Sequence, residues 1–181
     1  GRGFSIQRYA DEFDTPEKST AWGEALLAVE SGQYLESIED FMAYLCDPTE
    51  DNVKWQSERG KLYFEFYQGS KRVTGFADVE QLRATARIAR LDANNTDLLH
   101  RLTTMNYEMK YSRFAIDEDD CLTIVFDSPI NDVSPHKLYH ALKEMALRAD
   151  KQDDLLLDEF NEFLSPVEIT HLHELSKEEK G

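Results

Sequence analysis

The segment from Asn95 to Leu164 constrains the fold most, because one continuous pattern there contains both periodicities of regular structure. Apolar residues at helical spacing follow Asn95, and alternating residues then indicate strands over 112–117 and 121–127. Ser134-Pro135 is typical of a helix start, with serine as the N-cap and proline at the first helical position. We expect a helix, a β-hairpin and a long helix that the upstream chain completes.

Upstream of this unit the pattern changes once. Helical spacing predicts helices over about 18–31 and up to Leu45, with Gly32 between them as either a break or a kink. From Asn52 the apolar residues alternate with polar ones in four short runs separated by turn residues, which is typical of antiparallel hairpins with one wet face. We therefore predict an α+β fold with a single antiparallel sheet of five or six strands and helices packed on one face.

The length of 181 residues suits one domain, which could bury roughly 70% of its unfolded surface. We divide the chain into a polar N-terminal arm over 1–18, the domain over 19–165, and a short helix with a charged tail over 166–181. We expect the helix that begins at Ser134 either to run on or to restart near Asp153, and to stop by Pro166.

The net charge of −16 and the pI of about 4.6 argue against a nucleic-acid groove or an anionic membrane surface as the partner. Both would need a cationic surface, whereas an acidic chain suits a basic partner. No apolar run approaches the roughly 20 residues that cross a bilayer, and no secretory signal opens the sequence. We expect a cytoplasmic protein without a cofactor.

Several side chains could support chemistry, but each lacks the motif that the chemistry needs. His136 and His140, with His171 and His173, could bind zinc, yet the HExxH glutamate is absent, and we expect surface or half-buried histidines. The acidic run over 117–120 lacks the glycine and spacing of a calcium loop, which favours a solvated turn. The two cysteines, Cys46 and Cys121, show no metal or nucleophile signature and are interpreted as small structural residues.

A longer stretch resembles a known family. The matching run is LLHRLTTMNYEMKYSRFAIDEDDCLTIVFDSPINDVSPHKLYHALKEMALRADKQDDLL, joined upstream by VKWQ, LYFEFYQG and LRATARIARL. It resembles the bacterial YbjN family, which is related in fold to type III secretion chaperones, over about 21–163. The resemblance implies a twisted antiparallel sheet with helices on one side, often dimeric, and a role in binding segments of other proteins.

The residues that we predict as a contact surface lie in the upstream strands. Strand parity places Tyr63 and Tyr67 on the face of their strand that points away from the core residues, and Arg83 and Arg87 form the cationic side of a later strand. The arginines have two interpretations: a patch for an acidic peptide, or cross-strand partners of Glu58, Glu65 and Glu80.

The function we predict is non-enzymatic: a protein-binding, chaperone-like or regulatory module of a bacterial cytoplasm, and a homodimer. An extended partner segment would add to a sheet edge or face. Two alternatives stay open. One is an enzyme whose site is assembled from distant residues, such as Cys121 with a histidine. The other is a stress-response regulator that senses a small ligand in a pocket beneath the helices.

Overall fold

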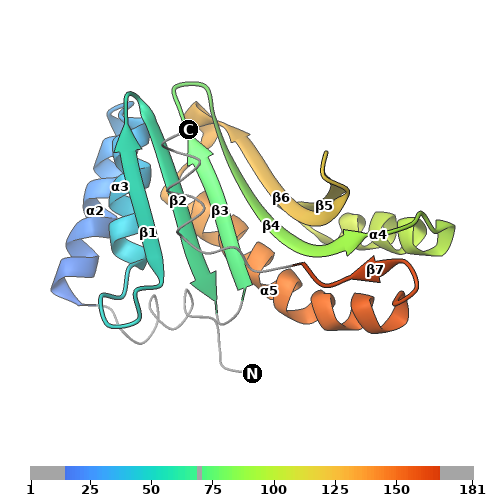
Figure 1. The fold of residues 1–181 in the computed structure, drawn as a ribbon. Coiled ribbons are helices and arrows are strands. Elements are labelled where there is room, and N and C mark those ends of the chain that lie inside the picture. Colours follow the sequence, from blue (N-terminus) through green and yellow to red (C-terminus); the bar gives the residue numbers. More distant parts are fainter. Residues whose placement is uncertain (1–14, 69–70, 168–181) are drawn as a thin grey trace.

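The computed structural model describes residues 15–68 and 71–167 (Figure 1). The order of elements is two helices, four strands, one helix, two strands, a 3-10 turn, a long helix and a final short strand. Their bounds are α2 (Pro16–Glu30), α3 (Tyr34–Leu45), β1 (Val53–Glu58), β2 (Lys61–Gln68), β3 (Lys71–Ala77), β4 (Gln81–Leu91), α4 (Thr96–Glu108), β5 (Arg113–Ile116), β6 (Cys121–Pro129), η1 (Ile130–Asp132), α5 (Pro135–Glu159) and β7 (Leu164–Ser165).

All strands of the described residues form one antiparallel sheet, which confirms the predicted α+β fold class. Six strands follow the order β1-β2-β3-β4-β6-β5, and the seventh, β7, pairs with the end of β4 through Arg90 and Leu91. The sequence analysis missed β7 because a strand of two residues has no detectable period. The sheet therefore has one strand more than the upper limit expected.

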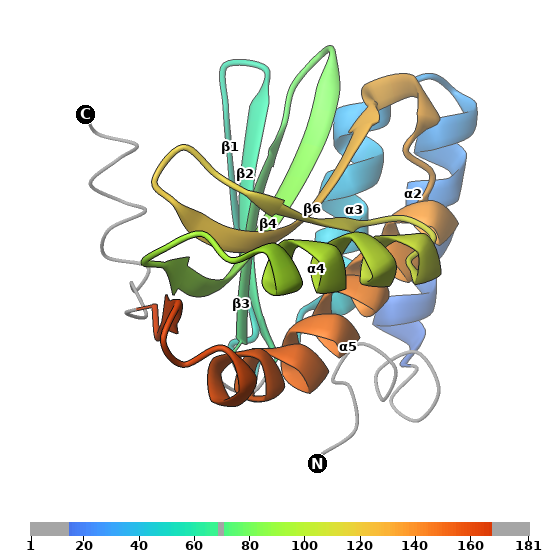
Figure 2. The same cartoon turned by 90° about the vertical axis from the view of Figure 1, so that its right-hand side faces the viewer.

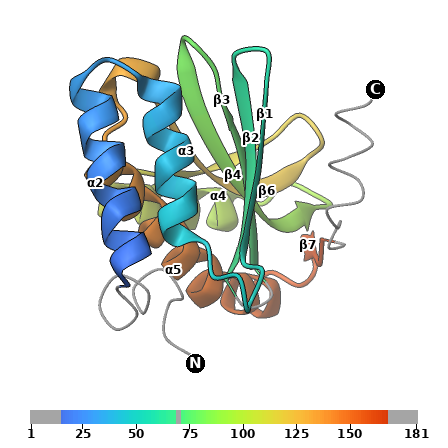
Figure 3. The same ribbon diagram turned by 90° about the vertical axis from the view of Figure 1, so that its left-hand side faces the viewer.

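The helices cover one face of this sheet and build a single core with it. Figures 1 and 3 show α2 and α3 beside each other on the side of β1 and β2, with α5 crossing behind the strands. Figure 2 shows α4 at the other end, next to β5 and β6. The largest fully buried side chains come from both layers: Phe41, Phe64, Phe66, Phe126, Ile38, Met42, Leu45, Leu62, Leu82, Leu98, Leu122 and Ile124. We call the opposite face of the sheet, which points away from this core, the outer face.

The predicted helix–hairpin–helix unit is present with the expected caps. The Asn95 side chain accepts a hydrogen bond from the Leu98 N–H at 3.0 Å, and the Ser134 hydroxyl accepts one from the Lys137 N–H at 3.1 Å. The long helix does not restart near Asp153 but runs on without interruption to Glu159, and thus ends before Pro166.

One carboxylate on α5 fastens the connection between α4 and β5. Glu144 accepts hydrogen bonds from the backbone N–H groups of Lys110, Tyr111 and Ser112 at 2.7, 3.0 and 2.7 Å, and from the Ser112 hydroxyl at 2.7 Å. Burial alone would raise the pKa of Glu144, but the hydrogen bonds from Ser112, Lys110 and Tyr111 outweigh it and lower the pKa. The carboxylate is therefore held ionised over this turn.

Gly32 breaks the two N-terminal helices apart rather than bending one helix. It has a φ of +77°, which favours glycine, and α2 ends two residues before it. Thr15 caps α2, whose start at Pro16 takes in the last residues of the predicted arm. Lys18 is buried and donates hydrogen bonds to the carbonyls of Tyr44 and Cys46, which fixes α2 against the end of α3.

A close approach between β2 and β3 requires a glycine on the core side of the sheet. A Cβ added to Gly75 would overlap the ring of Phe64 and lie 2.6 Å from the Arg83 carbonyl oxygen. The glycine thus makes room for one of the largest core side chains.

Within the described residues, no helix is long and apolar enough to cross a membrane. The predicted short helix and charged tail, apart from Pro166 and Val167, lie outside the described residues.

Candidate functional site

The four residues predicted as a contact surface share the outer face. The register places Tyr63 opposite Phe76, Phe76 opposite Arg83, and Arg83 opposite Asp127, so that one row crosses four strands. Two rows further along the same face, Tyr67 lies opposite Arg72, and Arg87 lies opposite Thr123. Both tyrosines are half-buried and both arginines are exposed. No finding tests whether this surface binds anything, so its role stays a prediction.

The outer-face arginines are paired with aspartates of the β5–β6 hairpin. Arg83 and Arg113 both reach Asp127, at 3.3 and 3.0 Å, and the hydrogen bond from Arg113 is the main reason that the pKa of Asp127 is lowered. Arg87 contacts Asp117 at 3.2 Å and Asp119 at 2.7 Å. The arginines are thus ion-paired across strands, as one of the two interpretations held. Their partners are these aspartates rather than Glu58 or Glu80.

Glu65 forms a buried polar cluster on the outer face, on the strand next to the β1 edge. Its side chain is fully buried, and its Oε1 atom accepts a hydrogen bond from the Tyr67 hydroxyl at 2.5 Å and forms an ion pair with Arg72 Nε at 3.1 Å. Burial and this hydrogen bond raise the pKa of Tyr67 to about 12, so the phenol stays protonated as a donor. The Oε2 atom of Glu65 has no hydrogen-bond partner within the part of the chain that the structure describes.

The β1 edge of the sheet has backbone groups that point outward. The two-residue turn Arg59-Gly60, with φ of +51° and +76°, joins β1 to β2 as a tight hairpin. The pair Glu58–Lys61 flanks this turn, and the Tyr67 N–H donates to the Asn52 carbonyl at 2.9 Å. Hydrogen-bonded and non-hydrogen-bonded pairs alternate along an antiparallel ladder. The backbone N–H and C=O groups of the even-numbered residues of β1 therefore bond to β2, whereas those of the odd-numbered residues point outward from the sheet edge.

The outward groups of β1 are therefore those of Val53, Trp55 and Ser57. The Val53 carbonyl lies 3.9 Å from the Cys46 sulfur. Among the described residues, no hydrogen bond reaches the backbone N–H or C=O of Trp55 or Ser57. Figure 3 views the sheet from this side, with α2 and α3 to one side of β1. The strand end from Gln56 to Glu58 is exposed.

The opposite edge, β5, is closed by a side chain. Asn106 of α4 accepts a hydrogen bond from the Phe114 N–H at 2.7 Å and donates one to the Phe114 carbonyl at 3.2 Å. Its amide thus takes the place that a neighbouring strand would occupy. The strand is also only four residues long, and short or covered edges resist pairing with other chains. The two edges of the sheet are therefore unequal.

The histidines and the acidic turn do not converge. His136 packs against Trp22, with ring centroids 5.0 Å apart, and His140 stacks on Tyr111 at 6.3 Å. Asp117 accepts hydrogen bonds from the N–H groups of Asp119 and Cys121, both at 2.9 Å, as expected for a turn. In the described segments, no group of three or more metal-ligating side chains comes together. His171 and His173 lie outside the described residues.

Both cysteines are free thiols whose burial raises their pKa. The Cys121 sulfur lies 3.8 Å from the Asp119 carbonyl oxygen, and the charged groups that act on it are arginines and aspartates. Since the thiolate is the nucleophile, a raised pKa weakens the alternative of a Cys121 nucleophile.

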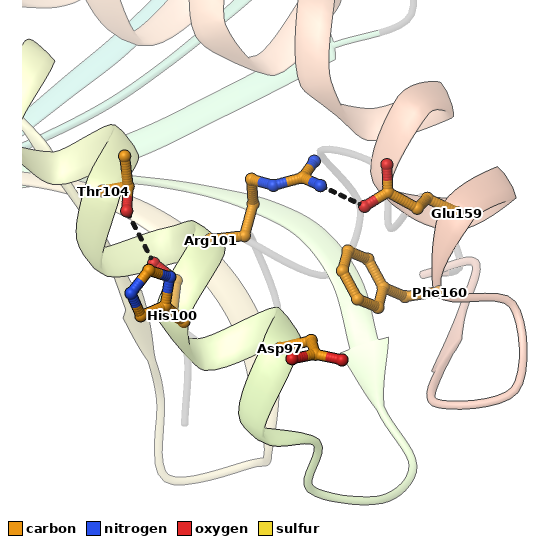
Figure 4. Close-up of a pocket in the computed structure, with 6 residues that line it drawn as sticks. All are labelled: Asp97, His100, Arg101, Thr104, Glu159 and Phe160. Atoms are coloured by element: carbon orange, nitrogen blue, oxygen red, sulfur yellow. Dashed lines mark hydrogen bonds and ion pairs between the residues drawn. The ribbon is translucent and has the colours of Figure 1, made fainter.

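A pocket of about 490 Å³ lies between the start of α4 and the end of α5 (Figure 4). Its lining residues are Asp97, His100, Arg101, Thr104, Glu159 and Phe160. Arg101 pairs with Glu159 at 2.5 Å and lies 5.7 Å from the Phe160 ring centre. Both members of this ion pair are nearly half exposed, so this side of the pocket is accessible to solvent.

Sequence reasoning missed two residues of these surfaces. Phe76 shares the outer face with the predicted tyrosines, and the register could have placed it there. Asn106 gave no signal, because its role depends on how α4 lies against β5 in three dimensions.

No family model matches the chain, and no curated protein matches it either. Solved structures do. One is the chaperone–effector complex of SchA with HopA1, matched with a TM-score of 0.50 and 12% identity over 69% of this chain and 97% of that one. Another is the Yersinia pestis type III secretion chaperone SycH in complex with a fragment of YscM2, with a TM-score of 0.47 and 18% identity over 65% of this chain and 97% of that one. The chain thus has a fold similar to that of a chain in the HopA1–SchA chaperone–effector complex.

Proposed function

We propose that this chain is a non-enzymatic protein-binding domain, chaperone-like or regulatory, which holds an extended segment of a partner at the β1 edge and on the adjoining outer face. The observation that carries the proposal is the inequality of the two sheet edges. Asn106 occupies the free backbone groups of Phe114 on β5, whereas those of Trp55 and Ser57 on β1 have no partner among the described residues.

An added strand would satisfy these outward groups. Each backbone hydrogen bond to β1 contributes affinity without depending on the sequence of the partner, and side chains give the specificity. The outer face next to β1 offers Tyr63 and Tyr67 on β2, and the exposed Arg83 and Arg87 on β4 lie farther along it. Aromatic and arginine side chains are enriched where interfaces gain most of their energy. We therefore keep these four residues as the proposed contact surface.

The fold and the cysteines support this class of function over an enzyme. The HopA1–SchA structure, which contains a chain with a similar fold, is a chaperone–effector complex. Both thiols have raised pKa values, and the described residues contain no cluster of metal ligands. Membership in the YbjN family and a place in a bacterial cytoplasm remain parts of the proposal, supported by the sequence resemblance alone.

A homodimer is the second part of the proposal. The side of the domain at α4 and β5 exposes large apolar side chains: Tyr107 is 90% exposed, Leu99 40% and Ile116 38%. Leu99 and Tyr107 are two helical turns apart, so both lie on one stripe of α4. Burying such a stripe against a second copy would remove apolar area from water. Light scattering tests this, and a concentration-independent monomer would contradict it.

The pocket in Figure 4 supports a second candidate function, the sensing of a small ligand. Its volume is in the range of small-molecule sites, which is about 300–1,000 Å³. A ligand that binds only the folded state would raise the melting temperature. A screen of metabolites by thermal shift, with Arg101→Ala as the control variant, tests this candidate, and shifts that persist in the variant would rule out the pocket.

The main proposal is tested by a proline on the β1 edge. Ser57→Pro removes an outward N–H while leaving the even-numbered bonds to β2 intact, and proline is tolerated on edge strands. The probes are dodecapeptides selected from a phage-displayed library against the purified wild-type protein. We expect Ser57→Pro to weaken these peptides at least about tenfold, the effect of losing one net hydrogen bond of roughly 1.4 kcal/mol.

The matched control is Ser57→Ala, which keeps the backbone N–H and should bind as the wild type does. Circular dichroism and melting temperature check that the proline variant is folded. The double variant Tyr67→Ala, Arg87→Ala tests the outer face in the same assay, and we expect it to abolish binding with an unchanged circular dichroism spectrum. Equal binding by the wild type, Ser57→Pro and the double variant would remove both surfaces from consideration.

A further inference from the structure

One oxygen of the Glu65 carboxylate has polar partners and the other has none among the described residues. Oε1 accepts a hydrogen bond from Tyr67 and is ion-paired with Arg72, but Oε2 is buried and without a donor among the described residues. Buried polar atoms are nearly always hydrogen-bonded, because an unpaired one loses its hydration and gains nothing in return. An unpaired oxygen of a buried carboxylate therefore indicates that a donor from outside this arrangement belongs there.

The neighbours of Glu65 on the outer face do not donate a hydrogen bond to this oxygen. Lys54 lies directly opposite Glu65 on β1, but its ammonium group bonds to Asp51 at 2.8 Å. Thr74 lies opposite on β3 and makes no hydrogen bond to the carboxylate. Lys54 and Thr74 are partly exposed, as are Tyr67 and Arg72. The side chains around Glu65 thus reach the surface, where a bound segment could contact them.

We infer that Glu65 is a receptor for one basic side chain, a lysine or an arginine, of the extended segment that binds at this face. The inference rests on the proposed function and adds a specificity determinant to it. A cationic donor suits the oxygen best, because charge-assisted hydrogen bonds to a carboxylate are roughly twice as strong as neutral ones. The net charge of −16 also favours a basic segment over a neutral or acidic one.

The position of Glu65 in the sheet fixes where the basic residue of the bound segment must lie. Glu65 bonds to β1 through its partner Lys54, so it lies one strand in from the open edge. A strand added to β1 would lie roughly 10 Å from β2, two inter-strand spacings away. Lysine and arginine are the side chains long enough to reach across β1 from there. The basic residue should therefore occupy one position of the bound segment.

The test uses the same phage-displayed dodecapeptides, selected in parallel against the wild type, Glu65→Gln and Glu58→Gln. Glu58→Gln is the matched control, since it removes one negative charge from an exposed position on the same strand pair. We expect wild-type and Glu58→Gln selections to enrich lysine or arginine at one position, and Glu65→Gln selections to lose that preference. Circular dichroism and melting temperature check the fold of each variant.

A second measurement does not depend on a protein variant. The enriched basic residue of one selected peptide is replaced by norleucine, and both peptides are titrated against the wild type and Glu65→Gln. We expect the replacement to weaken binding to the wild type about tenfold or more and to Glu65→Gln by less than about twofold. With only a general attraction between a basic peptide and an acidic protein, the replacement would weaken binding to both proteins alike and would not produce this difference.

The outcomes separate this inference from the function on which it rests. Peptides that bind at β1 without a basic preference, or equal losses with both proteins, would overturn the role of Glu65 and leave the protein-binding function standing. A selection that yields no binding peptides from the wild type would contradict both.

Discussion

Replacing Glu144 should loosen the helix–hairpin–helix unit on which the fold is built. The carboxylate accepts four hydrogen bonds from three of the four residues between α4 and β5. In Glu144→Ala these donors lose their acceptor. Lys110 is exposed, so its N–H returns to water at little cost, whereas Ser112 is buried with both its N–H and its hydroxyl.

The expected magnitude follows from these exposures. An unsatisfied buried group costs about 1–3 kcal/mol, and the half-buried Tyr111 N–H adds less, so we expect Glu144→Ala to lower the free energy of unfolding by about 3 kcal/mol. For a chain of this size that corresponds to a melting temperature lower by about 6–12 °C. Glu144→Gln keeps one acceptor oxygen for Tyr111 and Ser112, and should cost about 1 kcal/mol.

The pH dependence has a definite sign. The pKa of Glu144 is lowered in the folded state from its ordinary value of 4.5, so its stabilising effect is complete above that value and is lost as the pH falls through the folded pKa. The stability difference between the wild type and Glu144→Gln should therefore shrink on going from pH 7 towards pH 3.

Urea denaturation followed by the fluorescence of Trp22 and Trp55 measures these differences at each pH. Ser112→Ala completes a double-mutant cycle with Glu144→Ala, and a coupling near zero would show that the bond from the Ser112 hydroxyl contributes nothing. A loss below about 0.5 kcal/mol in Glu144→Ala, or a difference that grows on acidification, would refute this reasoning.

Other predictions follow from the same structure. Asn106→Ala should destabilise the domain by about 1–2 kcal/mol and promote self-association through the opened β5 edge, measured by urea denaturation and light scattering; a stable variant that does not associate would contradict the edge argument. Gly75→Ala should cost several kcal/mol, roughly 3 or more, because the methyl group overlaps Phe64; an unchanged melting temperature would show that β3 adjusts freely. Cys121 should react slowly with a thiol reagent at neutral pH, and rapid labelling would revive the nucleophile alternative.

The sequence was sufficient for the parts of the fold that local patterns determine. Asn95 and Ser134 predicted the starts of their helices because both are typical N-cap residues. The alternation of apolar residues placed Tyr63 and Tyr67 on the face away from Phe64. Arg83 and Arg87 were assigned to one cationic side of a strand, which the register of β4 supports.

What escaped prediction depends on contacts between distant segments. The partners of Arg83 and Arg87 lie on the β5–β6 hairpin, and only the strand order β4-β6-β5 brings those aspartates within reach. The closure of β5 by Asn106 requires the packing of α4 against that edge. The inequality of the edges, on which the proposed function rests, is therefore a property of the tertiary structure.

The most direct test of the proposal is amide hydrogen exchange of β1, resolved residue by residue by NMR, with and without a selected peptide. In the free protein the Lys54 and Gln56 amides bond to β2, whereas those of Trp55 and Ser57 point outward. The account predicts that the peptide slows exchange at Trp55 and Ser57 by at least about tenfold, with smaller changes at their neighbours. Unchanged exchange at both residues under saturating peptide would contradict binding at the β1 edge.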